Sequence, residues 1–174
     1  MADIKDIAKE RILILDGAIG TMIQQYSLTE DDFRGARFAG VSGMMKGNND
    51  MLNLTRPDVV ADIHRKYLEA GADIITTNTF SSQRISEADY NLACEAREMA
   101  YEGARLARRM ADRYSTSDKP RFVAGSVGPT NKTCSLSPDV SNPAARELDY
   151  ATLYDAYLEQ VDALVDGGAD LVLI

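Results

Sequence analysis

The sequence predicts a parallel α/β fold in which buried strands alternate with helices. Four short apolar runs are rich in branched residues and lack strict alternation, as is typical of strands covered on both faces: 11–17, 72–80, 121–129 and 169–174. Two segments, "EAGADIIT" at 69–76 and "DGGADLVLI" at 166–174, repeat one order: helix end, glycine stop, Ala-Asp and buried strand. A repeated αβ unit implies alternating strands and helices, and therefore a parallel sheet with right-handed crossovers.

Apolar residues at helical spacing predict three long helices between these strands. The first covers 55–70, with Thr55 as N-cap, Pro57 in the first turn and Gly71 as a left-handed C-terminal cap. The second covers about 86–114, and the third covers about 147–166 before the Gly167-Gly168 stop. Residues 27–50 show no period and contain many Gly, Asn and Asp residues, so we expect a long excursion, which is usually functional or disordered.

Length and composition predict one domain that binds neither nucleic acid nor a membrane. A chain of 174 residues suffices for one sizeable core. The net charge of −8 argues against nucleic acid and anionic membranes, because both require a basic surface. No apolar run is long enough to cross a bilayer, and the charged N-terminal segment does not resemble a signal peptide. Cys94 and Cys134 are therefore expected to be free thiols in a reducing cytoplasm.

Two architectures fit four strand–helix units. One is a small open doubly wound sheet of the flavodoxin type, in which an edge strand can end the chain. The other is the first half of an eight-stranded (βα)8 barrel, in which residues 171–174 must pair with a fifth strand. In both, ligands bind at the carboxyl ends of the strands.

The residues expected at those strand ends are small and polar. In "DGAIGT" (16–21), Asp16 could pair with an ammonium group while the amides near Gly17 bind a carboxylate; the alternative is a strand-end turn capped by Asp16. Thr77 and Asn78, in "TTNTF", could line a pocket or cap a turn.

The chain offers no other clear catalytic or metal-binding pattern. His64, the only histidine, is expected to be exposed or half-buried on a helix, so no Ser-His-Asp or Cys-His relay is assigned. Cys94 lies in a helical pattern, where cysteine behaves as a small buried hydrophobe, and Cys134 lies in the loop after the third strand. Two scattered cysteines do not form a zinc site, which needs three or four converging ligands.

Four longer stretches of the sequence can be compared with known families: "ILDGAIGTMIQ", "DFRG", "KGNNDMLNLTRPDVVADIHRKYLEAGADIITTNTF" and "VAGSVGPTNKTCSLSPDV". They resemble the homocysteine S-methyltransferase family, and the match extends from about residue 11 to the end. The Asp-Gly after strand one and the polar end of strand two are shared across the family. "KGNND" and "GPTN" point to one branch, the N-terminal homocysteine-binding module of cobalamin-dependent methionine synthases.

The resemblance implies a (βα)8 TIM barrel, of which residues 1–174 form the first four units as one incomplete domain. It also implies that homocysteine binds at the strand ends, where Asp16 and the amides near Gly17 hold the amino-acid end with Thr77 and Asn78 nearby. In the family a glutamate directly after strand four also binds the substrate amine, and that position follows Ile174. Thr76 stands where relatives often carry an acidic or amide side chain.

The resemblance further implies cofactors and partners. In the family, three cysteines on later strands hold zinc, and the zinc-bound thiolate takes a methyl group from methylcobalamin, which methyltetrahydrofolate recharges on other modules. Neither Cys94 nor Cys134 matches a ligand position. We therefore expect residues 1–174 to carry no catalytic residue, to bind neither zinc nor cobalamin and to be inactive alone. The expected partners are the second half-barrel, the cobalamin and folate modules, and a second copy through exposed edge strands.

Two rival interpretations remain at this stage. The chain could be a self-contained α/β module that binds an anionic metabolite at the "DGAIGT" segment without catalysis. A phosphate-handling barrel enzyme is weaker, because such sites usually draw on later strands.

Overall fold

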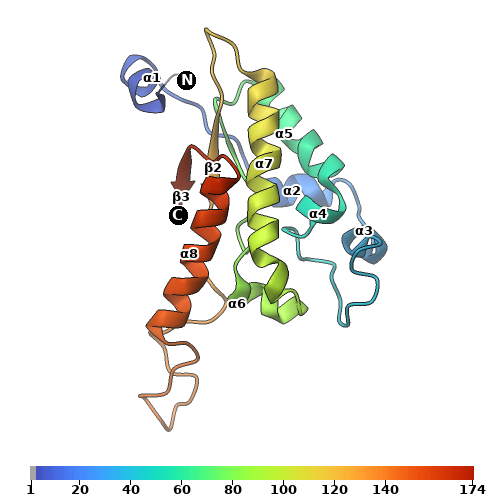
Figure 1. The fold of residues 1–174 in the computed structure, drawn as a ribbon, viewed down its shortest axis with the longest axis vertical. Helices are drawn as coiled ribbons and strands as arrows, with labels where there is room; N and C mark the ends of the chain where they lie inside the picture. Colours follow the sequence, from blue (N-terminus) through green and yellow to red (C-terminus); the bar gives the residue numbers. More distant parts are fainter. Residues whose placement is uncertain (1–2) are drawn as a thin grey trace.

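The computed structural model describes residues 3–174 as a parallel sheet with a layer of long helices on one face (Figure 1). Strands β1 (Ile74–Thr76), β2 (Phe122–Ser126) and β3 (Leu171–Leu173) pair in sequence order. Helix α5 (Pro57–Ala70) precedes β1, α7 (Ala96–Tyr114) connects β1 to β2, and α8 (Tyr150–Asp166) connects β2 to β3. The predicted parallel α/β fold is confirmed.

Short helices occupy the remaining segments. They are α1 (Ile4–Glu10), α2 (Ile19–Gln24), α3 (Glu30–Arg34), α4 (Leu52–Thr55) and α6 (Arg84–Glu87), with the 3₁₀ turns η1 (Ala88–Tyr90) and η2 (Ala93–Glu95). Helix α1 lies apart from the helical layer in Figure 1 and has no buried residue. No helix among residues 3–174 has the length and apolar character needed to cross a membrane.

The first predicted strand lies beside β1 but forms only a single bridge, between Leu15 and Ile74. The carbonyl of Ile14 accepts from the N–H groups of Asp73 (2.8 Å) and Ile74 (3.1 Å), and Asp16 N–H donates to the Ile74 carbonyl (2.9 Å). The spatial order of this segment, β1, β2 and β3 therefore follows the sequence without reversal. A doubly wound sheet contains a reversal, so the observed order favours the barrel alternative.

One face of the sheet carries the core. The strand side chains that face α5, α7 and α8 come from alternate positions, as the pleat requires. Ile75 and Val123 pack with Leu68, Ala107 and Ala111, and Val172 packs with Ala104 and Leu164. On the other face, Leu15 and Leu173 are 44% and 38% exposed. The expectation of strands covered on both faces therefore holds for β2, where Phe122, Val123 and Ala124 are all buried, but not for the first segment or for β3 within residues 3–174.

The repeated Ala-Asp of the sequence has one structural role in both copies. Asp73 accepts a backbone hydrogen bond from Ile14 N–H (2.9 Å) and two bonds from the guanidinium of Arg11 (2.9 Å each). Asp170 accepts from Val123 N–H (2.7 Å) and from Arg108 (2.8 Å). Each aspartate thus joins the start of its strand to the neighbouring strand and neutralises its charge with an arginine.

The ends of the predicted helices differ in detail. Gly71 ends α5 with φ +109°, as predicted, but Thr55 is not its N-cap, because Thr55 ends α4 and Arg56 occupies the cap position. The helix predicted at 86–114 begins only at residue 96. Asn91, with φ +59°, ends the η1 turn and interrupts the helical path. Helix α8 begins at residue 150, where Asp149 accepts from Thr152 N–H (2.7 Å).

Two side chains lie opposite to expectation. His64 is fully buried on α5, and neither ring nitrogen has a hydrogen-bond partner among residues 3–174. Cys94 is exposed on η2 rather than buried, because the chain turns there instead of continuing a helix. The packed environment of a helix side chain depends on which neighbours the fold brings to it, and the helical period alone does not specify them.

Candidate functional site

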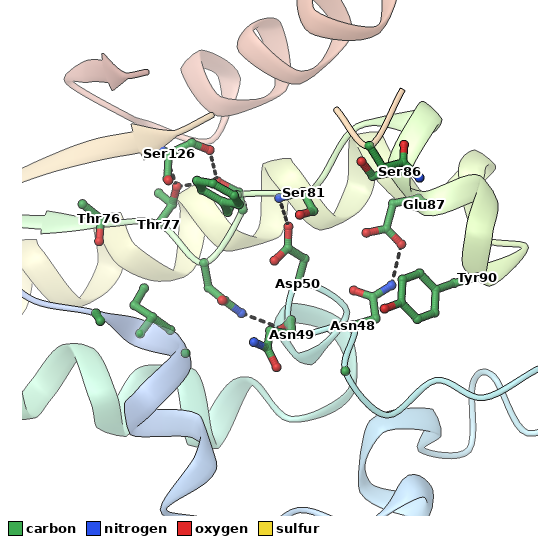
Figure 2. Close-up of a pocket in the computed structure, with 18 of the residues that line it drawn as sticks. Asn48, Asn49, Asp50, Thr76, Thr77, Ser81, Ser86, Glu87, Tyr90 and Ser126 are labelled. Atoms are coloured by element: carbon green, nitrogen blue, oxygen red, sulfur yellow. Dashed lines mark hydrogen bonds between the residues drawn. The ribbon is translucent and has the colours of Figure 1, made fainter. Parts of the chain in front are cut away.

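A cavity of about 510 Å³ opens at the carboxyl ends of the strands. Its walls come from segments 17–20, 47–50 and 76–81, parts of 86–90, and the side chains of Ser126 and Asn131. Figure 2 shows the labelled polar side chains converging on it from the strand ends and from the loop at 48–50. The strand-end position is the one expected for ligands of parallel α/β folds.

Of the predicted site residues, Gly17, Thr77 and Asn78 line the cavity, whereas Asp16 is not in the lining but is hydrogen-bonded to Thr76, which is. Both carboxylate oxygens of Asp16 are engaged by Thr76, which donates from its N–H (2.9 Å) and from its hydroxyl (3.0 Å). Thr76 therefore holds Asp16 in place. Burial raises the pKa of Asp16 to about 6, and the two bonds from Thr76 oppose that rise.

Thr77 is buried and connects β1 to β2. Its hydroxyl accepts from Ser126 N–H (2.9 Å) and lies 2.6 Å from the hydroxyl of Thr79, which in turn donates to the Ser126 carbonyl (2.8 Å). Since the Thr79 proton is directed to that carbonyl, Thr77 donates to Thr79. Thr77 thus has a structural role at the strand end in addition to its place in the cavity wall.

Asn78 is buried and fixes a neighbouring loop. Its side-chain amide donates to the Asn49 carbonyl (2.8 Å), and its own carbonyl accepts from the side chain of Asn53 (2.7 Å). Gly103 of α7 makes room for this arrangement. A Cβ at Gly103 would lie 2.5 Å from the Thr79 methyl group and 2.6 Å from the Asn53 amide.

The sequence did not predict a second wall of the cavity, which the loop 46–50 and helix α6 form together. Asp50 accepts from Ser81 N–H (2.7 Å) and the Ser82 hydroxyl (2.8 Å), and Glu87 accepts from the Asn48 amide (2.5 Å). Sequence reasoning assigned "KGNND" only to a family resemblance. The available signal for a site was its high content of Asn and Asp, in a segment without helical or strand periodicity.

Burial governs the protonation of this second wall. It raises the pKa of Asp50 to about 6, against the hydrogen bonds from Ser82 and Ser81. It raises the pKa of Glu87 to about 8, with a further upward contribution from the negative charge of Asp50 and a downward one from Asn48. Near neutral pH, Glu87 is therefore largely protonated and Asp50 largely ionised.

The described residues do not fit a zinc site. No group of three or more His, Cys, Asp or Glu side chains close enough to share a metal ion occurs among residues 3–174. Cys94 lies on the exposed η2 turn, and Cys134 is half-buried in the loop after β2. Because thiolate ligands must converge within about 2.3 Å of the metal, no chemical step through zinc can be derived from this part of the chain.

The cavity is suited to a small zwitterion. Residues 17–20 form its first wall, where Gly17 and Ala18 are exposed, and the half-buried Asp16 precedes them. Asn49, Ser81 and Ser126 add neutral donors and acceptors, and Phe80 adds an aromatic surface. An ammonium near a carboxylate and a carboxylate near backbone amides are both charge-assisted contacts, so an amino acid has complementary partners here.

Solved structures share this fold. The chain is similar to the homocysteine methyltransferase MmuM of Escherichia coli in its oxidised form (TM-score 0.71, 20% identity), its metallated form (0.71, 19%) and its apo form (0.60, 22%). The matches cover 99%, 98% and 95% of this chain and 56%, 56% and 49% of the respective MmuM chains. The chain thus spans about half the length of these structures and corresponds to half of a TIM-barrel-type fold, as the sequence predicted.

Sequence identities this low show only that the fold is shared. A family profile shows the evolutionary relationship. The profile described as homocysteine S-methyltransferase matches residues 13–174, which is nearly the whole chain. The match includes the segments 17–20, 47–50 and 76–81 that line the cavity. This chain belongs to the homocysteine S-methyltransferase family.

Proposed function

We propose that the cavity binds homocysteine as part of a methyltransferase that converts it to methionine. The observation that carries this proposal is the cavity at the strand ends of a homocysteine S-methyltransferase family member, with Asp16 hydrogen-bonded to Thr76 of its lining and residues 17–20 in one wall. Asp16 holds the substrate ammonium, the amides near Gly17 hold the carboxylate, and Thr77 and Asn78 complete the wall. The family match and the polar lining support these assignments.

We further propose that the whole protein is a cobalamin-dependent methionine synthase acting in the cytoplasm. The resemblance of "KGNND" and "GPTN" to that branch supports this proposal, and residues 47–50 and Asn131 of these stretches line the cavity. Zinc and methylcobalamin, recharged from methyltetrahydrofolate, are then the cofactors of the whole protein. Their donor groups and the remaining barrel strands are assigned to parts of the protein other than residues 3–174.

Asp16→Asn is expected to weaken homocysteine binding about tenfold or more, because the isosteric amide keeps its shape beside Thr76 but lacks the charge that pairs with the ammonium. Wild-type affinity should rise as the pH rises through about 6, where Asp16 becomes ionised, and the variant should lack this dependence. Titration calorimetry with L-homocysteine between pH 5 and 7 measures both effects. Asp31→Asn, at an exposed position of α3, is the matched control, and equal affinities for the two variants would refute the assignment.

We also propose that residues 1–174 alone do not catalyse methyl transfer, since the described residues offer no donor set to activate the thiol. The purified chain, incubated with zinc, L-homocysteine and methylcobalamin, should form methionine no faster than a protein-free mixture. Turnover that depends on both the chain and zinc would contradict this expectation.

A further inference from the structure

Hydrogen bonds from side chains of both segments hold the loop 46–50 against the segment that follows β1. Glu87 accepts from the Asn48 amide, Asp50 accepts from Ser81 and Ser82, and the Asn78 amide donates to the Asn49 carbonyl. Figure 2 shows Asn48 against Glu87, and Asp50 against Ser81, along one side of the cavity. Displacing this loop would therefore remove one wall of the cavity.

The two carboxyl groups in this wall are buried without a cation. Glu87 and Asp50 are only 1% and 5% exposed, and neither forms a salt bridge among residues 3–174. The titratable groups around Glu87 are Asp50 from the loop and Asp89 and Tyr90 from η1. Arg84, on the same helix as Glu87, is paired with Glu159 of α8.

Two buried negative charges side by side would be costly. Ionising Glu87 strengthens its hydrogen bond to Asn48. Burying a charge without a counterion costs more than this one bond gains, and repulsion from Asp50 adds to that cost. The balance favours hydration of the ionised carboxylate, which requires the loop to move away.

We propose that Glu87 is a positioning residue for the substrate cavity: in its protonated form it holds Asn48 and keeps the loop 46–50 closed, and loss of that proton releases the loop and weakens ligand binding. This inference rests on the proposed function, because homocysteine is the ligand whose binding it modulates. Proton loss is expected near pH 8, the pKa to which burial raises Glu87. The decrease of homocysteine affinity at high pH is thus assigned to Glu87, and the decrease at low pH is assigned to Asp16.

The test uses the full-length protein and two measurements between pH 7 and 9. Titration calorimetry gives the affinity for L-homocysteine, and amide hydrogen exchange gives the protection factors of residues 46–50. If only the closed form binds, affinity at pH 9 should be about tenfold lower than well below pH 8. Protection of the loop should decrease over the same range, after correction for the intrinsic exchange rate.

Glu87→Gln separates this effect from the titration of homocysteine itself. Glutamine can still accept from Asn48 but stays neutral, so the ratio of affinities at pH 7 and 9 should be several-fold smaller than in the wild type, and loop protection should not change with pH. Glu87→Leu removes the acceptor, so the loop should be weakly protected at every pH. Glu147→Gln, which changes an exposed acid outside the cavity, should keep the wild-type ratio.

Each outcome decides the proposal. A wild-type ratio in Glu87→Gln, or loop protection in the wild type that does not change with pH, would overturn it. If the wild type binds no homocysteine at any pH, the proposed function fails, and the exchange profiles of the wild type and Glu87→Gln still decide whether Glu87 holds the loop.

Discussion

Replacing Asp73 with alanine is expected to lower the free energy of unfolding by roughly 2 kcal/mol, because the change removes three hydrogen bonds to a buried carboxylate, two of them from a partly exposed guanidinium. The side chain of Asp73 is 2% exposed and receives three hydrogen bonds, two from Arg11 and one from Ile14 N–H. Burial alone would raise its pKa, but the bonds from Arg11 and Ile14 outweigh burial and lower it. Alanine would leave the guanidinium and the N–H without their acceptor.

The loss should be largest where the first segment joins the sheet. That segment pairs with β1 through a single bridge, so Asp73 supplies much of its attachment. Denaturant unfolding measures the global effect, and hydrogen exchange at Ile14 and Asp16 reports detachment of the segment. Asp166→Ala, which breaks the exposed pair with Arg97, is the control and should cost less than about 0.5 kcal/mol. Similar losses in the two variants would show that Asp73 is not a special attachment point.

His64 is expected to make the fold sensitive to acid. Burial lowers its pKa to about 4, from an ordinary value near 6.5, and neither ring nitrogen has a partner in the described residues that could stabilise a proton. Between these two values the unfolded chain binds a proton that the folded chain does not. The stability contributed by neutral His64 is therefore complete above pH 6.5 and is lost as the pH falls towards 4, by roughly 3 kcal/mol in total.

His64→Leu should remove this loss while filling a similar volume. Asp16 and Asp50 contribute with the opposite sign over part of this range, because their pKa values are raised in the folded state. The relevant quantity is therefore the difference between the two unfolding free energies, measured by urea titration from pH 4 to 7. As the pH falls, the free energy of unfolding of the variant should increasingly exceed that of the wild type. A difference that does not change with pH would contradict the assignment.

The sequence located the elements of this fold better than their ends. Helix α5 and its Gly71 cap were predictable, because amphipathic spacing and a left-handed glycine are local signals. The interruption before α7 was not, because residues 86–95 keep apolar spacing while Asn91 turns the chain. The first strand was predicted as a full strand, but how many bridges it forms depends on its neighbours, which lie far away in sequence.

The residues of the candidate site likewise divide into those that the sequence could predict and those that it could not. Gly17, Thr77 and Asn78 were predictable as cavity residues because polar residues directly after buried strands meet at one edge of a parallel sheet. Asp50 and Glu87 were not, because they lie 37 positions apart and their proximity is created by hydrogen bonds to Ser81, Ser82 and Asn48. No local pattern indicates that either carboxyl group is buried.

The sequence by itself determined the alternation of strands and helices, the strand-end position of the site and the duplicated Ala-Asp, since each depends on periodicity or on residues close together in the chain. Only the tertiary structure decided that His64 is buried, that Thr76 holds Asp16, and that the loop 46–50 closes a cavity against Glu87. These features depend on burial and on contacts between distant segments, and it is burial that changes the protonation of His64, Asp16 and Glu87.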